Sequence, residues 1–278
     1  MTLINPSINC VGLTHAKKHM SIKVEPFTVG DYIHAYNCGN KKAQIFFDKS
    51  DYWRFSWCLR FFNDQRSIYD FAKCLTDLVY EQKEILQKLR GSDPRRKAPY
   101  LDGRNTFEWR TEEWGEQQPL VQIISYHLSP NHFHLFLKEI ISGGISKFMQ
   151  KIGGGYTVYR NLKSHEAGRI FQGSYRGKTI KDERYFQYLD AYIQVFNAFE
   201  LFEGGILNAL NHFDEAFQFA LDYPFCSLGE SFGIRNLGIV NRSSFQEKFP
   251  NLETYKEFCR DALLTRSVRE FLGKLTLE

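Results

Sequence analysis

Residues 120–140 read Leu-Val-Gln-Ile-Ile-Ser-Tyr-His-Leu-Ser-Pro-Asn-His-Phe-His-Leu-Phe-Leu-Lys-Glu-Ile, and this stretch decides the fold. Its first part, 120–127, has the composition of a strand, and its last part, 132–140, alternates between two kinds of side chain. The intervening Ser129-Pro130-Asn131 has the composition of a turn. The stretch therefore predicts an antiparallel hairpin within a β-sheet.

His132 and His134 stand two residues apart on the second predicted strand. Because side chains alternate along a strand, both histidines project from one face and Phe133 projects from the other. Two imidazoles so placed can share one metal ion, and His127 on the partner strand is a possible neighbour. An isolated His-x-His pair is more often an ordinary polar pair on a wet strand face. The pattern alone therefore leaves both interpretations open.

The remainder of the chain alternates between predicted strands and helices. A strand is predicted over 31–37, and a hairpin over 165–181 with arms at 169–172 and 175–180. Helices are predicted from Ser50, as N-cap, to Phe62; over 67–90; from Ile145 to Asn161 with a break near Gly153–Gly155; from Glu183, capped by Asp182, to Phe199; over 205–222; and over 252–272, capped by Asn251. This order predicts an α+β fold, with a ferredoxin-like antiparallel sheet and helices on one face.

Composition is consistent with one elaborated globular domain. The 278 residues are 43% hydrophobic and 24% charged, which supports a sizeable core and argues against wholesale disorder. We divide the chain into a leader (1–26), a main domain (27–240) with an insertion or loop at 91–118, and a C-terminal helical tail (241–278). No run of ~18 apolar residues occurs, so we expect no membrane span. The six scattered cysteines are typical of reduced thiols, and we expect a cytoplasmic protein.

Tyr192 is the candidate nucleophile, because a tyrosine hydroxyl can attack a phosphodiester and form a covalent phosphotyrosine. A metal ion held by the two histidines would polarise the phosphate under attack. A tyrosine on an amphipathic helix is usually a core residue, and Tyr156, Tyr159 and Tyr188 are competitors on similar grounds. The residue type alone does not choose among them.

Segment 160–184 is locally basic, with seven lysines and arginines against three acidic residues, while the whole chain has a net charge of +4. Aromatic residues are interleaved with the basic ones, a combination that suits single-stranded or hairpin nucleic acid. A solvated charged hairpin is the alternative interpretation. The candidate DNA contacts are Arg160, Lys163, Arg169, Tyr175, Arg176 and Lys178.

The run from Ile124 to Leu135 resembles the metal-binding strand pair of the HUH single-tyrosine transposases. The nearest branch is the REP-associated tyrosine transposases, relatives of the insertion-sequence 200 group. Similar blocks follow the family order across about 27–240: Tyr32–Asn40, Lys147–Lys151, Tyr156–Asn161, Gly168–Tyr175, Tyr188–Ile193 and Tyr223–Leu228. The chain departs from the family at Ser129, where methionine is common, and at Cys38, where arginine is usual.

The resemblance implies the HUH endonuclease fold and a metal-dependent endonuclease and strand transferase that acts on single-stranded DNA. His132 and His134 would hold Mg²⁺ or Mn²⁺, and Tyr192 would keep the 5′ phosphate and release a 3′ hydroxyl. Imperfect DNA hairpins are the substrates that the family often recognises. Whether one chain or a homodimer assembles the site is left open.

The third metal ligand departs from the family pattern. A glutamine or asparagine is common four residues after the tyrosine, where this chain has Phe196, and Asn197 comes one residue later. On a regular α-helix four residues turn about 40° from the start and five about 140°. Asn197 is therefore predicted to point away unless the helix contains a π-bulge. Gln194 is a poorer candidate by angle.

Two other functions stay open on the sequence. The altered third-ligand position and Cys38 are consistent with a non-catalytic DNA-hairpin-binding protein derived from a transposase. A metal hydrolase of another phosphodiester is the third possibility. Only the transposase-like reaction would leave DNA covalently attached to the protein.

Overall fold

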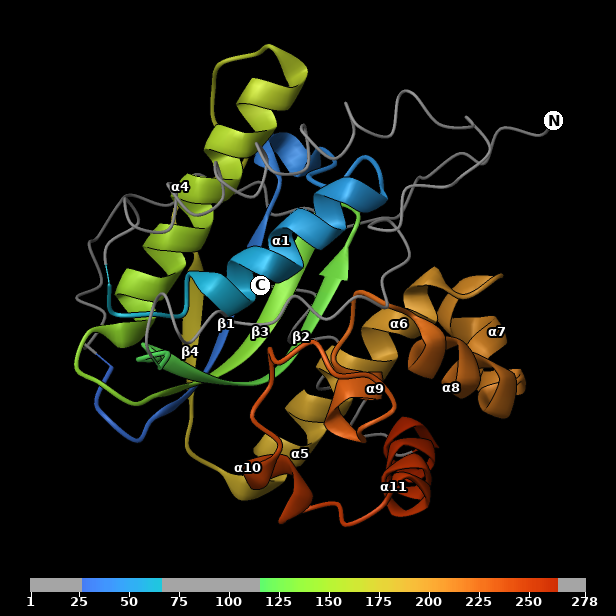
Figure 1. Cartoon of the computed structure of the whole chain (residues 1–278). Helices are drawn as coiled ribbons and strands as arrows, with labels where there is room; N and C mark the ends of the chain where they lie inside the picture. The colour runs from blue at the N-terminus through green and yellow to red at the C-terminus, as the bar shows by residue number, and fades with distance from the viewer. Residues whose placement is uncertain (1–26, 67–115, 265–278) are drawn as a thin grey trace, which may run out of the picture.

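Four antiparallel strands form one sheet in the order β2-β3-β1-β4 (Figure 1). The computed structural model describes residues 27–66 and 116–264, so the expected leader, the helix over 67–90 and most of 91–118 lie outside the described residues. The strands are β1 (Tyr32–Cys38), β2 (Val121–Ser129), β3 (His132–Glu139) and β4 (Arg176–Ile180). The helices are η1 (Asn40–Lys42), α1 (Lys49–Phe61), α4 (Gly144–Ser164), α5 (Glu183–Ala191), η2 (Tyr192–Phe196), α6 (Asn197–Leu201), α7 (Gly205–Asn211), α8 (Phe213–Asp222), α9 (Leu228–Ser231), α10 (Ser243–Gln246) and α11 (Leu252–Leu264).

The chain order β1-α1-β2-β3-α4-β4 with this strand order is the ferredoxin-like topology, so the predicted α+β fold is confirmed. The hairpin predicted from 120–140 is present as β2 and β3, which pair antiparallel. β1 lies between β3 and β4 and is antiparallel to both. This arrangement places β3, with its two histidines, in the interior of the sheet.

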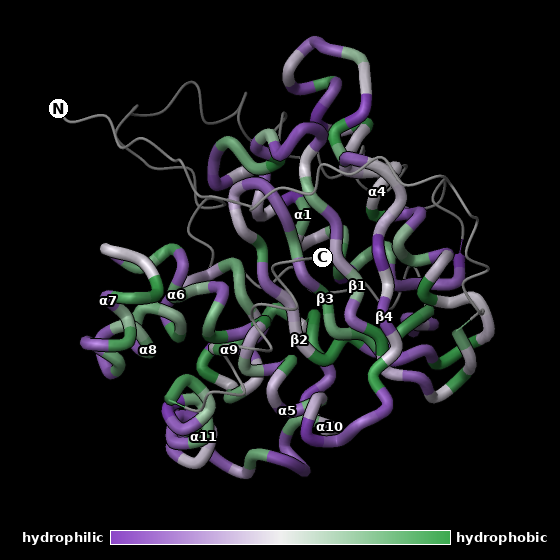
Figure 2. Tube along the Cα trace, turned by 180° about the vertical axis from the view of Figure 1, so that it is seen from behind, coloured by the Kyte–Doolittle hydropathy of each residue, from purple (hydrophilic) through white to green (hydrophobic). Residues whose placement is uncertain are grey.

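Helices α1 and α4 cover one face of the sheet, as predicted (Figure 1). Phe133, Leu135 and Leu137 point to this face, where they share a buried cluster with Phe55 and Phe148. The helical additions cover the other face, because the intervening Phe136 belongs to a second cluster with residues of α5, η2, α6, α8 and α11. The strands become hydrophobic toward the end that meets α5 (Figure 2).

The two helices of the first layer differ in detail from their predicted forms. Asp48, not Ser50, caps α1, because its carboxylate accepts hydrogen bonds from the backbone N–H groups of Ser50 and Asp51. The predicted break in α4 is absent, and the helix runs without interruption through its three glycines. Gly155 instead allows close packing, since a Cβ there would lie 2.3 Å from the ring of Phe62.

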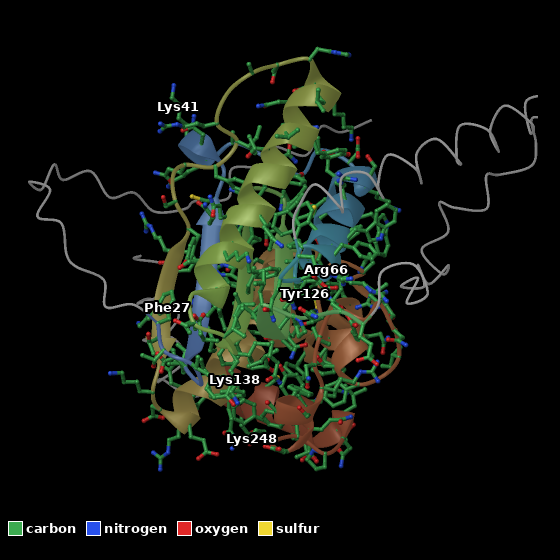
Figure 3. The ribbon with its side chains drawn as sticks, turned by 60° about the vertical axis from the view of Figure 1, so that its left-hand side comes forward. Phe27, Lys41, Arg66, Tyr126, Lys138 and Lys248 are labelled. Carbon is green, nitrogen blue, oxygen red and sulfur yellow. The ribbon has the colours of Figure 1, made fainter. Side chains whose placement is uncertain are left out.

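The hairpin predicted over 165–181 does not form. Both of its arms lie along the same edge of β1: β4 pairs with Tyr32–Tyr36, and Phe171 bridges to Gly39 beyond the end of β1. The arms follow one another along one strand and so do not pair together. Phe27 covers Gly177 of β4 (Figure 3), where a Cβ would lie 2.7 Å from its ring.

The C-terminal helices pack on the second face. The helix predicted over 205–222 is divided at His212 into α7 and α8, while Asn251 caps α11 as predicted, accepting from the backbone N–H of Thr254. Tyr255 and Leu263 of α11 belong to the same cluster as α5, so the described part of the predicted tail packs on the main domain. Among the described residues, no helix has the length and apolar character to cross a membrane.

Candidate active site

Four histidines gather on the face of the sheet that α5 and its continuation cover. His134 of β3 is the register partner of Tyr36 on β1 and of His127 on β2. His34 lies two residues before Tyr36 on β1 and therefore on the same face of the sheet. Direct cross-strand partners share a face. The rings of His34 and His132 both lie with centroids 5.0 Å from that of His134. The sheet thus brings together histidines from three strands.

Each of the two predicted metal ligands has one ring nitrogen held by a neighbour. Nδ1 of His134 lies 2.9 Å from Nε2 of His34, and Nδ1 of His132 lies 2.7 Å from Oδ1 of Asn131. The Asn131 oxygen can only accept, so His132 carries its proton on Nδ1. Nε2 is then the nitrogen left for a metal ion on His132, and it is also the remaining nitrogen on His134. Such outer partners fix the orientation of ligating imidazoles.

Burial keeps these imidazoles neutral. It lowers the pKa of His132 to about 4 and that of His34 to about 3. The pKa values of His127 and His134 are lowered well below the usual range, again mainly by burial. A metal ion binds imidazole in its neutral form, so at neutral pH no proton competes with the metal at these rings.

Tyr192 lies at the start of a π-helical segment directly over the histidines. Its ring centroid is 5.4 Å from that of His134 and 6.4 Å from that of His34. Asp182 caps the preceding helix α5, as predicted, by accepting from the backbone N–H groups of Arg184 and Tyr185. The structure therefore brings the predicted nucleophile to the predicted metal ligands within a single chain.

The π-helix η2 brings Asn197 to the same side as Tyr192. The backbone N–H of Asn197 donates to the carbonyl of Tyr192, five residues earlier, so one wide turn separates the two. The Asn197 side chain approaches His132 and opposes the effect of burial on its pKa. Its Nδ2 donates to the Tyr192 carbonyl at 2.9 Å, while its buried Oδ1 has no hydrogen-bond partner among the described residues.

This donor set fits a divalent ion with open coordination positions. Two imidazole nitrogens and the unpartnered amide oxygen of Asn197 are available. Within the described residues, no three His, Cys, Asp or Glu side chains are grouped so as to hold a metal ion. The third donor would therefore be Asn197. Phe196 is buried in the core, and Gln194 is turned away into another network.

The competing tyrosines lie elsewhere. Tyr156 donates its hydroxyl to the Ile45 carbonyl, and Tyr159 donates to Asp51, both in the layer of α1 and α4. Tyr188 contacts Phe258 of α11. Of these four tyrosines, Tyr192 is the one whose ring contacts the ring of His134.

The candidate DNA contacts separate into two groups. Arg160 is buried, lies 3.4 Å from Asp51 and covers the Phe47 ring, so its predicted DNA role is not supported. Lys163 is bonded to Asp48 and Asp51 at the end of α4 and also serves the fold. The other group is at the sheet edge: Arg169, Arg176 and Lys178 are exposed and Tyr175 is half-buried.

The exposed group adjoins the histidines. Arg176 is the register partner of Tyr36, and Lys178 is the partner of His34. His34 itself was missed as a site residue, because it lies 100 positions from His134 along the chain. The signal available was a histidine within the first predicted strand, but the pairing of β1 with β3 is needed to place it beside His134.

Residues 105–195 match the model of the family described as "Transposase IS200 like". The resemblance to these transposases is therefore confirmed for the segment that carries His132, His134 and Tyr192. A solved structure of a REP-associated tyrosine transposase bound to a REP hairpin is similar at 13% identity and a TM-score of 0.38, over 81% of this chain and 88% of that one. The search of curated proteins found no match.

Proposed function

We propose that this protein cuts and rejoins single-stranded DNA through a covalent bond between Tyr192 and the 5′ phosphate. The observation that carries the proposal is the contact of the Tyr192 ring with His134, with Asn197 one π-turn later beside His132. A nucleophile and a metal-ligand set around one point are the components that phosphodiester transfer needs.

The chain's own residues hold the reacting groups in place. His132, His134 and Asn197 would hold Mg²⁺ or Mn²⁺, which when bound withdraws charge from the scissile phosphate. His34 orients His134 through the 2.9 Å contact between their rings. The Tyr192 oxygen forms a bond to phosphorus as the bond to the 3′ oxygen breaks, and in net one proton passes from the phenol to that 3′ oxygen, which leaves as a hydroxyl. The reverse attack rejoins the strand and needs no nucleotide cofactor.

DNA would reach the site along the edge strand. Arg169, Arg176 and Lys178 offer cations for phosphates, and Tyr175 offers a ring on which a base can stack. Because one chain supplies both the histidines and the tyrosine, a homodimer is not needed to complete the site. Hairpin DNA is the proposed substrate, with unstructured single strands as the comparison.

The test is adduct formation on a denaturing gel. Fluorescently labelled hairpin DNA and unstructured single-stranded DNA are each incubated with Mn²⁺ and one of three proteins: wild type, Tyr192→Phe or Tyr188→Phe. Tyr188 is the matched control, since it lies one helical turn before Tyr192 but contacts Phe258. We expect an adduct with wild type and Tyr188→Phe and none with Tyr192→Phe. Equal adduct from Tyr192→Phe would remove Tyr192 from its proposed role.

A non-catalytic hairpin binder is the second candidate. Cys38 favours this candidate, because the family that the chain resembles usually has an arginine at this position. The Cys38 thiol donates to Oε1 of Gln172, and Cys38 is the register partner of His132. This function predicts salt-sensitive hairpin binding without any adduct. The same gel, run beside a binding assay, separates the two candidates.

A further inference from the structure

A buried hydrogen-bond network surrounds Gln194 in the middle of the π-helix. Gln194 donates through Nε2 to Oδ2 of Asp190 at 2.7 Å. Its Oε1 accepts from the hydroxyls of Ser227 and Ser231, both at 2.9 Å. Tyr255 of α11 donates to the same Asp190 oxygen at 2.9 Å. All five side chains are buried, so each bond is made without competition from water.

The same network reaches the strand that pairs with β3. The Ser227 hydroxyl accepts from the backbone N–H of Tyr126 at 2.9 Å. Residues 225–227 run along β2, with Leu128 N–H donating to the Phe225 carbonyl and Ser227 N–H donating to the Tyr126 carbonyl, both at 3.0 Å. Ser227 therefore touches both β2, beside His127, and the residue two positions after Tyr192.

A π-turn needs such support because it is rarely stable alone. Its i→i+5 bonds are an uncommon arrangement that occurs mainly where function requires it. Gln194 lies in the middle of η2, and its carbonyl accepts from the Cys226 thiol at 3.3 Å. Both its side chain and its backbone are thus bonded to residues 226–231, the segment after α8 whose first residues run along β2.

We infer that Gln194 and Ser227 form a clamp that fixes the π-turn against the sheet and so sets the position of Tyr192 and Asn197 relative to His132 and His134. Asp190, Ser231 and Tyr255 hold Gln194 in that position. These are positioning residues, since none of them contacts the histidines directly in the observed bonds. The inference rests on the proposed function for its kinetic consequence, although not for its structural one.

The kinetic test compares Gln194→Leu with Gln218→Leu. Gln218 is a matched control because its Nε2 also donates to an aspartate on its own helix, Asp222, at 3.0 Å, but on the exposed surface of α8. We expect single-turnover adduct formation at saturating DNA and Mn²⁺ to fall by about 10- to 100-fold in Gln194→Leu, since small misplacements of reacting groups have effects of this size. DNA affinity should stay within about twofold, because the basic edge is not altered. A Gln194→Leu rate equal to wild type would overturn the clamp.

The second measurement does not depend on activity. Amide hydrogen exchange of residues 192–197 should accelerate in Gln194→Leu and, to a smaller extent, in the milder Ser231→Ala, which keeps Ser227. The acceleration should be confined to this turn and absent in Gln218→Leu. Unchanged exchange at 192–197, or an equal rise throughout the chain, would overturn the clamp. If wild type forms no adduct, the proposed function fails while the exchange result still decides the clamp.

Discussion

Asp190 is a carboxylic acid with no exposure to water, two residues before Tyr192. Burial raises its pKa to about 6, and the hydrogen bonds from Gln194 and Tyr255 oppose this only in part. In the unfolded chain an aspartate has a pKa of about 3.9. The folded protein therefore keeps a proton on Asp190 between about pH 4 and pH 6 that the unfolded chain has released.

The stability contribution of Asp190 consequently falls as the pH rises through this window and is level above it. Asp190→Asn cannot titrate, so its free energy of unfolding should lack this decrease. From pH 4.5 to pH 7 the free energy of unfolding of wild type should fall by about 1–3 kcal/mol relative to that of the variant. Urea unfolding at the two pH values measures it, and parallel curves for the two proteins would contradict the raised pKa.

Asn197 shows why the site was only partly predictable at the scale of single residues. The resemblance proposes His132, His134 and Tyr192 as site residues, because the blocks that carry it are read directly from the sequence. The proposed third donor depends on the helix geometry between positions 192 and 197, and a regular helix would have turned Asn197 away. The π-helix removes that obstacle, but its stability comes from Ser227 and Tyr255, which are far along the chain.

At the scale of elements, helix α4 makes a sharp prediction through two adjacent glycines. A Cβ at Gly155 would lie 2.3 Å from the buried ring of Phe62, whereas a Cβ at Gly154 would meet nothing within 4 Å. Gly154→Ala should therefore raise the free energy of unfolding by about 0.5–1 kcal/mol, since alanine is the better helix former. Gly155→Ala should lower it by about 1–3 kcal/mol through overpacking.

Denaturant unfolding of the two variants beside wild type measures both effects. The opposite signs are the important result, because both substitutions add the same methyl group to the same helix. A stabilising Gly155→Ala would mean that Phe62 can move aside without cost and that α1 and α4 are not closely fitted there.

Elements were predictable where their causes are local. The alternation in 120–140 and the turn at Pro130 suffice for the β2–β3 hairpin, and the Asp182 and Asn251 side chains are enough to start α5 and α11. The partner of β4 was not predictable in this way, because an arm over 169–172 is nearer in sequence than β1. The pairing of β4 with β1 joins residues that are far apart in the sequence. Ile180, the last residue of β4, is buried in the hydrophobic cluster that contains α5.

At the scale of the whole molecule, the modest net charge of +4 conceals an uneven distribution. The fold uses two of the cations in 160–184, Arg160 and Lys163, to hold α4 against the start of α1. The exposed cations of the edge strand, Arg176 and Lys178, remain next to the histidine face. The proposed DNA path therefore depends on where charge lies and not on its total.

Two double variants that remove equal charge test this distribution. Arg176→Gln with Lys178→Gln changes the edge strand, while Lys256→Gln with Arg260→Gln changes α11, on the opposite side of the molecule (Figure 1), where both cations are bonded to Asp214. Each phosphate contact to a single strand contributes about 0.7 to the slope of log K against log salt concentration. The edge variant should thus bind single-stranded DNA more weakly and lose about 1.4 from that slope, and the α11 variant should lose little. Equal losses in both would show that binding follows net charge, and Arg176 and Lys178 would then not be specific contacts.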